Sequence, residues 1–257
     1  MKTSGFGKLA FLILLSGVFF SPEAQAFKKV YSPIVHKGEL ELEYQGAVDF
    51  DNRHGFDDAQ QHKFAVGYGV TDWWATEVYA EMEKEAREEQ EEDMDGTRPF
   101  FYSATSWENR FQLTEQGKYW LDLGFYVEYA WAQQSEAPDE LEMKILLEKE
   151  TGDFTHRLNL IFEKEIGGEE PAGWEPGFAW QTLYRFRQEF KPGFEIYSSF
   201  GPVREQGPFR EQKHFIGPVA EGRLFKNIKY NVGYLFGITD NTPGGKLKFI
   251  LEWEHRF

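Results

Sequence analysis

Carboxylates recur at every second position near the start of the chain and again at its end. Glu39, Glu41 and Glu43 occur in "GELELEYQ", and Glu252 and Glu254 occur in "LEWEHRF". Side chains two residues apart on a β-strand share a face and lie about 7 Å apart. Two carboxylates at that separation could serve as the acid and base of an inverting glycosidase. They could also belong to a wet, mixed-charge interior, and the sequence favours this second interpretation because basic residues occur on the same faces.

Basic side chains that could neutralise these acids occur in other segments with the same period of two. We expect the first three glutamates to meet some of Lys246, Lys248 and Arg256 across the seam between the first and last segments. The residues predicted to line the charged interior are Glu39, Glu41, Glu43, Arg110, Glu128, Lys144, Arg185, Arg187, Lys229, Lys248, Glu252 and Glu254. We predict no catalytic residue, no metal ligand and no cofactor in this set.

Acidic runs also occur between the alternating segments. "EKEAREEQEEDMD", at residues 83–95, holds eight acids against two bases. A loop of this kind is most simply a solvated segment. The alternative is that this run, together with Asp49, Asp51, Asp57 and Asp58, binds Ca²⁺ or Mg²⁺ through oxygen ligands. Its spacing matches no defined calcium loop, so the solvated interpretation is preferred.

Charged and apolar residues alternate along the whole chain, which is the pattern of β-strands that separate two environments. "LEMKILLEK", for example, places Leu141 and Met143 on one face and Glu142 on the other. Such segments are predicted at roughly 37–50, 61–70, 74–84, 101–114, 117–130, 140–150, 154–165, 178–190, 193–203, 212–224, 228–238 and 246–257. The segment at 212–224 contains a proline and changes register, which predicts a β-bulge near residues 221–222.

The composition is typical of a β-barrel in a membrane. Aromatic residues make up 18% of the chain, with 25 Phe, 12 Tyr and 8 Trp, although the mean hydropathy is −0.57. After residue 26 no apolar stretch approaches the roughly 18 residues that a transmembrane helix needs. A barrel reconciles these values, because alternation halves the mean hydropathy while aromatic girdles raise the number of rings. The net charge of −15 argues against nucleic acid as a partner.

The first 26 residues have the pattern of a secretory signal peptide. Two lysines precede the apolar run "LAFLILLSGVFF", and Ala24, Gln25 and Ala26 supply a small-residue cleavage site. The mature domain is therefore predicted to comprise residues 27–257, with an uncleaved N-terminal anchor as the alternative. The chain contains no cysteine, so neither a lipoprotein anchor after this site nor a disulfide is expected.

The connections between the segments alternate in length. The short ones are predicted at 71–73, 115–116, 151–153, 191–192 and 226–227, and the others are longer. Short periplasmic turns opposite longer extracellular loops are typical of outer-membrane barrels. An even number of strands then places both termini in the periplasm, and the last strand must close against the first. No long plug domain is expected, since only residues 27–36 precede the first strand.

The C-terminal segment resembles the end of Gram-negative outer-membrane barrels. Phe257 follows apolar residues at alternate positions (Phe249, Leu251 and Trp253), and His255 stands where such proteins usually carry an aromatic such as Tyr. The chain is similar to a small, loosely transporter-like proteobacterial family of such barrels. The resemblance implies location in the cell outer membrane, contact with its lipid and lipopolysaccharide, and recognition by the barrel-assembly machinery through the C-terminal strand.

Twelve-stranded outer-membrane phospholipases resemble this chain in size, but their His-x-Ser-Asn-Gly context does not occur in it. Their chemistry needs a His–Ser pair at the outer rim. Only His62 and His214 fall near that rim within predicted strands, and neither has a serine two residues away. We therefore predict that the protein is not an enzyme.

Together these patterns predict an all-β protein, a single antiparallel transmembrane β-barrel of about twelve strands, with ten as the alternative. The expected function is a narrow channel or transporter for small solutes with a charged lumen. The alternatives are a structural or adhesion barrel that acts through acidic surface loops and a lipid-modifying enzyme. Twelve strands lie between the filled eight-stranded barrel and the open sixteen-stranded one. Acidic and basic side chains in separate rows along the lumen would favour passage of solutes. Acidic and basic side chains that are fully paired would favour a closed barrel.

Overall fold

A computed structural model describes residues 29–257 except 54, 87–97, 136 and 169–172. The signal peptide predicted at residues 1–26 lies outside this range. The strands are β1 (Glu39–Phe50), β2 (Gln60–Gly69), β3 (Trp74–Lys84), β4 (Phe101–Gln112), β5 (Asp122–Ala132), β6 (Asp139–Thr151), β7 (Phe154–Ile166), β8 (Glu175–Tyr184), β9 (Lys191–Ser199), β10 (Lys213–Leu224), β11 (Ile228–Gly237) and β12 (Gly245–Arg256), with a 3₁₀ turn at Phe209–Glu211. The described part of the chain holds no helix long and apolar enough to cross a membrane.

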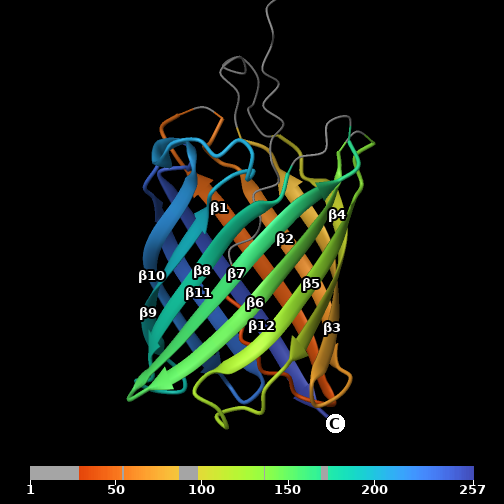
Figure 1. Cartoon of the computed structure of the whole chain (residues 1–257), viewed down its shortest axis with the longest axis vertical. Helices are drawn as coiled ribbons and strands as arrows, with labels where there is room; N and C mark the ends of the chain where they lie inside the picture. The colour runs from red at the N-terminus through yellow and green to blue at the C-terminus, as the bar shows by residue number, and fades with distance from the viewer. Residues whose placement is uncertain (1–28, 54, 87–97, 136, 169–172) are drawn as a thin grey trace, which may run out of the picture.

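The strands form one closed, antiparallel barrel in which each strand pairs with its neighbours in the sequence and β1 pairs with β12 (Figure 1). The seam is continuous, with registers running from Glu39 opposite Arg256 to Phe50 opposite Gly245. Closure leaves no unpaired strand edge, which is the condition for a sheet in hydrocarbon. The prediction of twelve strands is therefore confirmed, and the alternative of ten is wrong.

The two faces of the barrel differ as the alternation predicts. On β2, Phe64, Val66 and Tyr68 are exposed on the outer surface, whereas the intervening Ala65 is buried. The same outward exposure of large apolar side chains recurs on other strands around the barrel. A contiguous apolar surface of this size is unfavourable in water and favourable in lipid. The protein is thus a transmembrane β-barrel of the outer-membrane type.

The connections at one end of the barrel are mostly shorter than those at the other, but the connection predicted at 115–116 runs from 113 to 121 and is not short. One end, here called the turn end, carries residues 70–73, 113–121, 152–153, 185–190 and 225–227, and the opposite loop end carries 51–59, 85–100, 133–138, 167–174, 200–212 and 238–244. The β1–β12 seam ends at the turn end, where the Phe257 N–H donates to the Gly38 carbonyl at 3.1 Å. That this end faces the periplasm stays a prediction.

Some predicted strand boundaries were wrong. The segment at 117–130 forms a strand only from Asp122, and the segment at 178–190 ends at Tyr184, because an isolated bridge between Arg187 and Phe190 closes a turn there. The register of β10 is constant against both neighbours, so the bulge expected near residues 221–222 does not occur. A register shift lies instead between Glu81 and Met82, where β3 pairs with β4.

The short stretch before β1 enters the barrel rather than lying outside it. Residues 29–37, here called the N-terminal segment, run through the lumen toward the turn end (Figure 1), and Val30, Tyr31 and Val35 are buried. Gly38 adopts a φ of +74°, a left-handed conformation that glycine takes without strain, where the chain leaves the lumen and begins β1. No long plug domain exists in the described residues, but this segment fills the same space.

Gly69, on the inner face of β2, provides room for this segment. A Cβ at position 69 would lie 1.9 Å from the carbonyl oxygen of His36, so the replacement Gly69→Ala must displace the segment or the wall. Overpacking of this kind costs about 1–3 kcal/mol of unfolding free energy. We expect Gly69→Ala to lower the urea midpoint of the refolded barrel. Gly173→Ala, whose Cβ would meet only Pro202 at 3.9 Å, is the control. Equal midpoints for the two variants would contradict this packing.

Candidate functional site

The lumen is the only space enclosed by the described strands, and side chains on the N-terminal segment and on the wall fill most of it. The segment is held by side chains of the wall. The Tyr31 N–H donates to Asn159 Oδ1 at 2.7 Å, and Asn159 Nδ2 donates to the Tyr31 carbonyl at 2.9 Å. The Val35 N–H donates to Gln112 Oε1 at 2.9 Å. These amides satisfy backbone groups that are buried without a partner strand.

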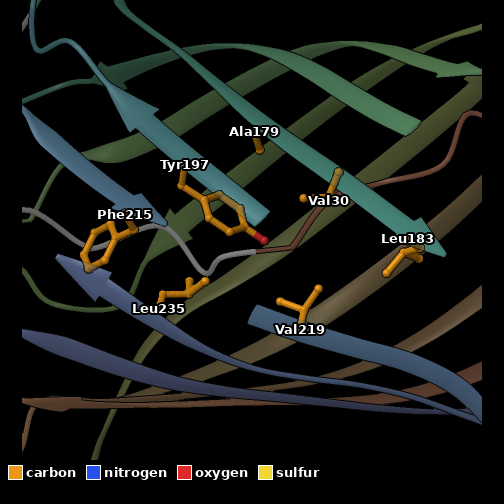
Figure 2. Close-up of a cluster of buried hydrophobic side chains, with 7 residues drawn as sticks. All are labelled: Val30, Ala179, Leu183, Tyr197, Phe215, Val219 and Leu235. Atoms are coloured by element: carbon orange, nitrogen blue, oxygen red, sulfur yellow. The ribbon is translucent and has the colours of Figure 1, made fainter. Parts of the chain in front are cut away.

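An apolar pocket on the inner wall receives Val30. Figure 2 shows Val30 facing Ala179, Leu183, Tyr197, Phe215, Val219 and Leu235 from strands β8 to β11, and these residues form one buried cluster. Phe215 and Val219 occupy inner positions of β10, where the other strands carry mainly polar residues. The irregular pattern of the segment at 212–224 therefore comes from an apolar inner face and not from a bulge.

Aromatic rings and a lysine hold the middle of the N-terminal segment. The rings of Tyr31 and Tyr126 lie 4.8 Å apart between centroids. The Lys144 ammonium lies 4.5 Å from the first ring and 4.2 Å from the second. A cation over aromatic faces is attracted by their quadrupoles, and Glu142 binds the same ammonium at 2.6 Å.

Lys29, which precedes the strands, contributes a positive charge to the lumen. Its ammonium forms ion pairs with Glu43 and, at 3.4 Å, with Glu252. Oxygens of Glu41, Glu43 and Glu252 lie within 4.8 Å of one another. Among the described residues, Glu41 forms no ion pair. Lys29 is a lumen residue that the sequence did not predict, because nothing in its local pattern indicates that the tail turns inward.

The wall contains further ion pairs. Lys246 binds Asp49 at 2.7 Å across the seam, and Arg256 binds Glu39 at 3.2 Å. Of the three bases expected to meet the first glutamates, therefore, only Arg256 does so. Lys248 binds Glu195 at 2.6 Å, and both side chains are fully buried.

The remaining predicted lining residues lie in two different places. On the inner wall, Arg110 lies 3.9 Å from Glu77, Glu128 lies 4.0 Å from Lys63, and Lys229 and Arg223 bind Glu254. Arg185 and Arg187 lie in the turn at 185–190, outside the lumen. Arg185 donates to the Gly152 carbonyl at 2.5 Å, and the Arg187 guanidinium lies over the Phe186 ring.

A row of glutamates crosses the inner wall from strand to strand. Its members are directly opposite one another in register, in the order Glu254, Glu41, Gly67, Glu77, Glu108, Glu128, Glu142, Glu163 and Glu175. The row is interrupted only at Gly67, against which the Glu77 side chain packs. We call it the acid row.

A cavity of about 220 Å³ opens at the turn end beneath the N-terminal segment. It is lined by Ile34, Val35, His36, Lys37, Asp72, Gln112, Gln116 and Arg256. Its lining comes from the N-terminal segment, from the turns at 70–73 and 113–121, and from the adjoining ends of β4 and β12.

The loop-end aspartates considered as cation ligands mostly bind basic side chains. Asp51 accepts hydrogen bonds from Arg53 and, at 2.7 Å, from the Gly244 N–H. Asp58 binds Lys84 at 2.5 Å, and the Asp57 carboxylate accepts the Asp51 N–H at 3.2 Å. Residues 87–97 of the acidic run lie outside the described residues.

The histidines near the rim bond to groups other than serine. His62 Nδ1 lies 2.8 Å from the Tyr44 hydroxyl. His214 Nε2 lies 3.0 Å from Gln212 Oε1, and its ring stacks on Phe209 with centroids 4.5 Å apart. These contacts do not build the nucleophile and base of a hydrolase.

The Lys248–Glu195 pair gives a direct test of the wall. Lys248→Met leaves a buried carboxylate without its cation, and removing one partner of a buried pair costs about 3–5 kcal/mol. The double variant Lys248→Met/Glu195→Gln should recover much of that loss. Urea titration of the refolded proteins in a double-mutant cycle would measure the coupling. Additive effects of the two substitutions would contradict the pairing.

The Asp51–Arg53 contact predicts a pH dependence at the loop end. Hydrogen bonds from Arg53 hold the pKa of Asp51 well below its ordinary value of 3.8. Because the folded pKa is depressed, the stabilisation is complete above about pH 4 and is lost as the pH falls through the folded pKa. We expect Asp51→Asn to accelerate hydrogen exchange of the Gly244 amide at pH 7. Because the arginine in this contact is exposed, the free energy of local opening should fall by only about 1 kcal/mol.

A matched control for this measurement is Asp153→Asn, which removes an exposed carboxylate at the turn end. Its Gly244 amide should exchange at the wild-type rate. If the Gly244 amide of Asp51→Asn also exchanged at that rate, Asp51 would not hold the loop at 238–244.

Comparisons with known proteins place the fold. No protein-family model matches the chain, and no curated protein sequence matches it. The NanC porin has a similar structure, with a TM-score of 0.55 and 8% identity over 84% of this chain and 99% of that one. The COG4313 outer membrane channel from Pseudomonas putida F1 gives a TM-score of 0.59 and 9% identity over 90% of this chain and 98% of that one. At such low identity the likeness establishes a shared fold, that of outer-membrane barrels.

Proposed function

We propose that the protein is a narrow outer-membrane channel through which small solutes pass when the N-terminal segment moves. The observation that carries this proposal is how the segment is held. Its central backbone bonds to the side chains of Asn159 and Gln112 and does not add a strand to the sheet. The apolar contacts of Val30 and the ion pairs of Lys29 are likewise side-chain contacts and not a strand ladder, so the segment can leave while the barrel stays closed.

Two further observations support passage through the lumen. The inner wall carries charged and polar side chains, which a solvated solute can contact without losing all its hydrogen bonds. The fold is also that of proteins named as a porin and an outer membrane channel. On this proposal the protein acts passively and not as an enzyme, in contact with outer-membrane lipid and lipopolysaccharide. The C-terminal strand would present Phe257 to the assembly machinery.

A closed structural barrel is the second candidate function. The ion pairs of Lys248 with Glu195 and of Lys246 with Asp49 favour it, because paired charges fill space and stiffen a wall. Arg157 adds a third such contact, at 2.8 Å from both Glu148 and Glu221. A barrel of this kind would act through its loops and would never conduct.

A reversible crosslink between the segment and the wall separates the two functions. A Cβ at Gly124 would lie 2.7 Å from the Pro33 Cβ, and a disulfide needs its Cβ atoms about 3.5–4.5 Å apart, so a shift of about 1 Å suffices. The chain has no cysteine of its own. We expect the double variant Pro33→Cys/Gly124→Cys to open in discrete conductance steps in a planar bilayer when reduced, and to be silent when oxidised.

The single variants Pro33→Cys and Gly124→Cys are the controls, and their conductance should not respond to reductant. Equal conductance of the double variant in both redox states would refute gating by the segment. A folded protein that is silent under reducing conditions would refute the channel and favour the structural barrel.

A further inference from the structure

The acid row follows a path from one end of the lumen to the other. Residues opposite each other in register lie along the direction perpendicular to the strands, and barrel strands are tilted (Figure 1). The row therefore climbs as it passes around the wall. It begins at Glu254 and Glu41, close to the turn end, and finishes at Glu163 and Glu175, close to the loop end. A solute that crosses the barrel passes along this row.

The row carries more negative charge than its immediate neighbours neutralise. Lys229 and Arg223 bind Glu254, and Lys144 binds Glu142 at 2.6 Å. Arg110, however, lies 3.9 Å from Glu77, and Lys63 lies 4.0 Å from Glu128 and binds Glu81 instead, at 2.9 Å. Glu108, in the middle of the row, is 1% exposed, and within the described residues its Oε2 has no hydrogen-bond partner. A buried carboxylate oxygen in this position is costly unless a donor reaches it.

A tethered primary amine already occupies the turn-end part of this path. The Lys29 ammonium lies on Glu43 and Glu252, beside Glu41, which is the second member of the row. It comes from the N-terminal segment and not from the wall. When the segment moves, the ammonium leaves with it, so Glu43 loses its ion pair and Glu252 keeps only Lys229, at 4.0 Å. Glu41, Glu43 and Glu252 stay within 4.8 Å of one another. Repulsion among them then favours any cation that can take its place.

The surroundings fit an organic ammonium better than a bare metal ion. An ammonium donates three hydrogen bonds and tolerates the aromatic faces of tyrosines, as Lys144 does between Tyr31 and Tyr126. Lys63 lies near a further ring, 5.9 Å from that of Tyr79. The lumen thus places carboxylates and aromatic rings together along one route.

From these contacts we propose that the channel is selective for cations and takes solutes with primary amino groups, for which Lys29 is the resident substitute. This inference rests on the proposed channel function and names its substrate class. The amine of the solute binds Glu41, Glu43 and Glu252 once Lys29 has left, and Glu77, Glu108 and Glu128 are the next carboxylates along the row.

Binding of 1,4-diaminobutane to the refolded full-length protein tests the amine site without requiring conduction. If Lys29 occupies the site nine-tenths of the time, its removal strengthens binding about tenfold, because the apparent dissociation constant scales inversely with the competent fraction. We therefore expect Lys29→Gln to bind the diamine about tenfold more tightly than wild type by titration calorimetry. Lys29→Gln/Glu43→Gln should lose most of this gain. Lys118→Gln, which removes an exposed lysine from a turn, should bind like wild type.

Reversal potentials in a KCl gradient test the selectivity of the open channel. The reduced crosslink variant should prefer K⁺ over Cl⁻, and adding Glu108→Gln to it should weaken that preference. Anion preference in a conducting channel would overturn the inference while leaving the channel intact. Diamine affinity unaffected by Lys29→Gln would overturn the amine site, and binding of Mg²⁺ in place of the diamine would assign the site to a metal. A silent channel that still binds the diamine would refute the channel function alone.

Discussion

Backbone hydrogen bonding in a medium without water is the constraint on which this structure depends. Every amide in the hydrocarbon layer must find its partner within the sheet, and only closure of β1 on β12 achieves this. Closure then separates an apolar outer face from an enclosed inner one. The inner face carries many buried charged side chains, so acids and bases must pair across it. The ion pairs of the wall and Lys29 of the N-terminal segment meet that requirement, and the acid row meets it only in part.

The N-terminal segment is part of the core of the barrel as much as it is an obstruction. Val30 fills an apolar pocket, Tyr31 packs against Tyr126 with tilted rings, and Lys29 compensates carboxylates of the seam. A wall built to receive these three side chains is left with unmatched groups when they leave. The contacts that hold the N-terminal segment in the lumen therefore also determine which solutes could take its place. Closure of the lumen and selectivity for solutes depend on the same wall residues.

Period-two alternation predicted the strands and the inner position of most charged residues, because these depend on neighbours in the sequence. The seam between β1 and β12 followed instead from the need to close the sheet. It could not predict that Lys29 lies on Glu43, since that contact depends on a tail with no periodicity. Two signals pointed to the inserted segment. The apolar inner positions Phe215 and Val219 broke the pattern of β10, and Asn159 and Gln112 are neutral amides on a wall of charges. Arg185 and Arg187 were misplaced because a turn at 185–190 continues the alternation of the strand before it.

The position of Gly38 affects how Lys29 competes with free amines for the carboxylates of the lumen. The residues from 29 to 37 span at most about 30 Å when extended, which is close to the thickness of the hydrocarbon layer. Gly38 is bonded to Gly69 and Phe257, so the tether stays attached at the turn end whatever the segment does. A released Lys29 therefore remains at an effective concentration in the millimolar range near its site. Free amines compete against that local concentration, so the length of the tether sets the solute level at which the lumen opens.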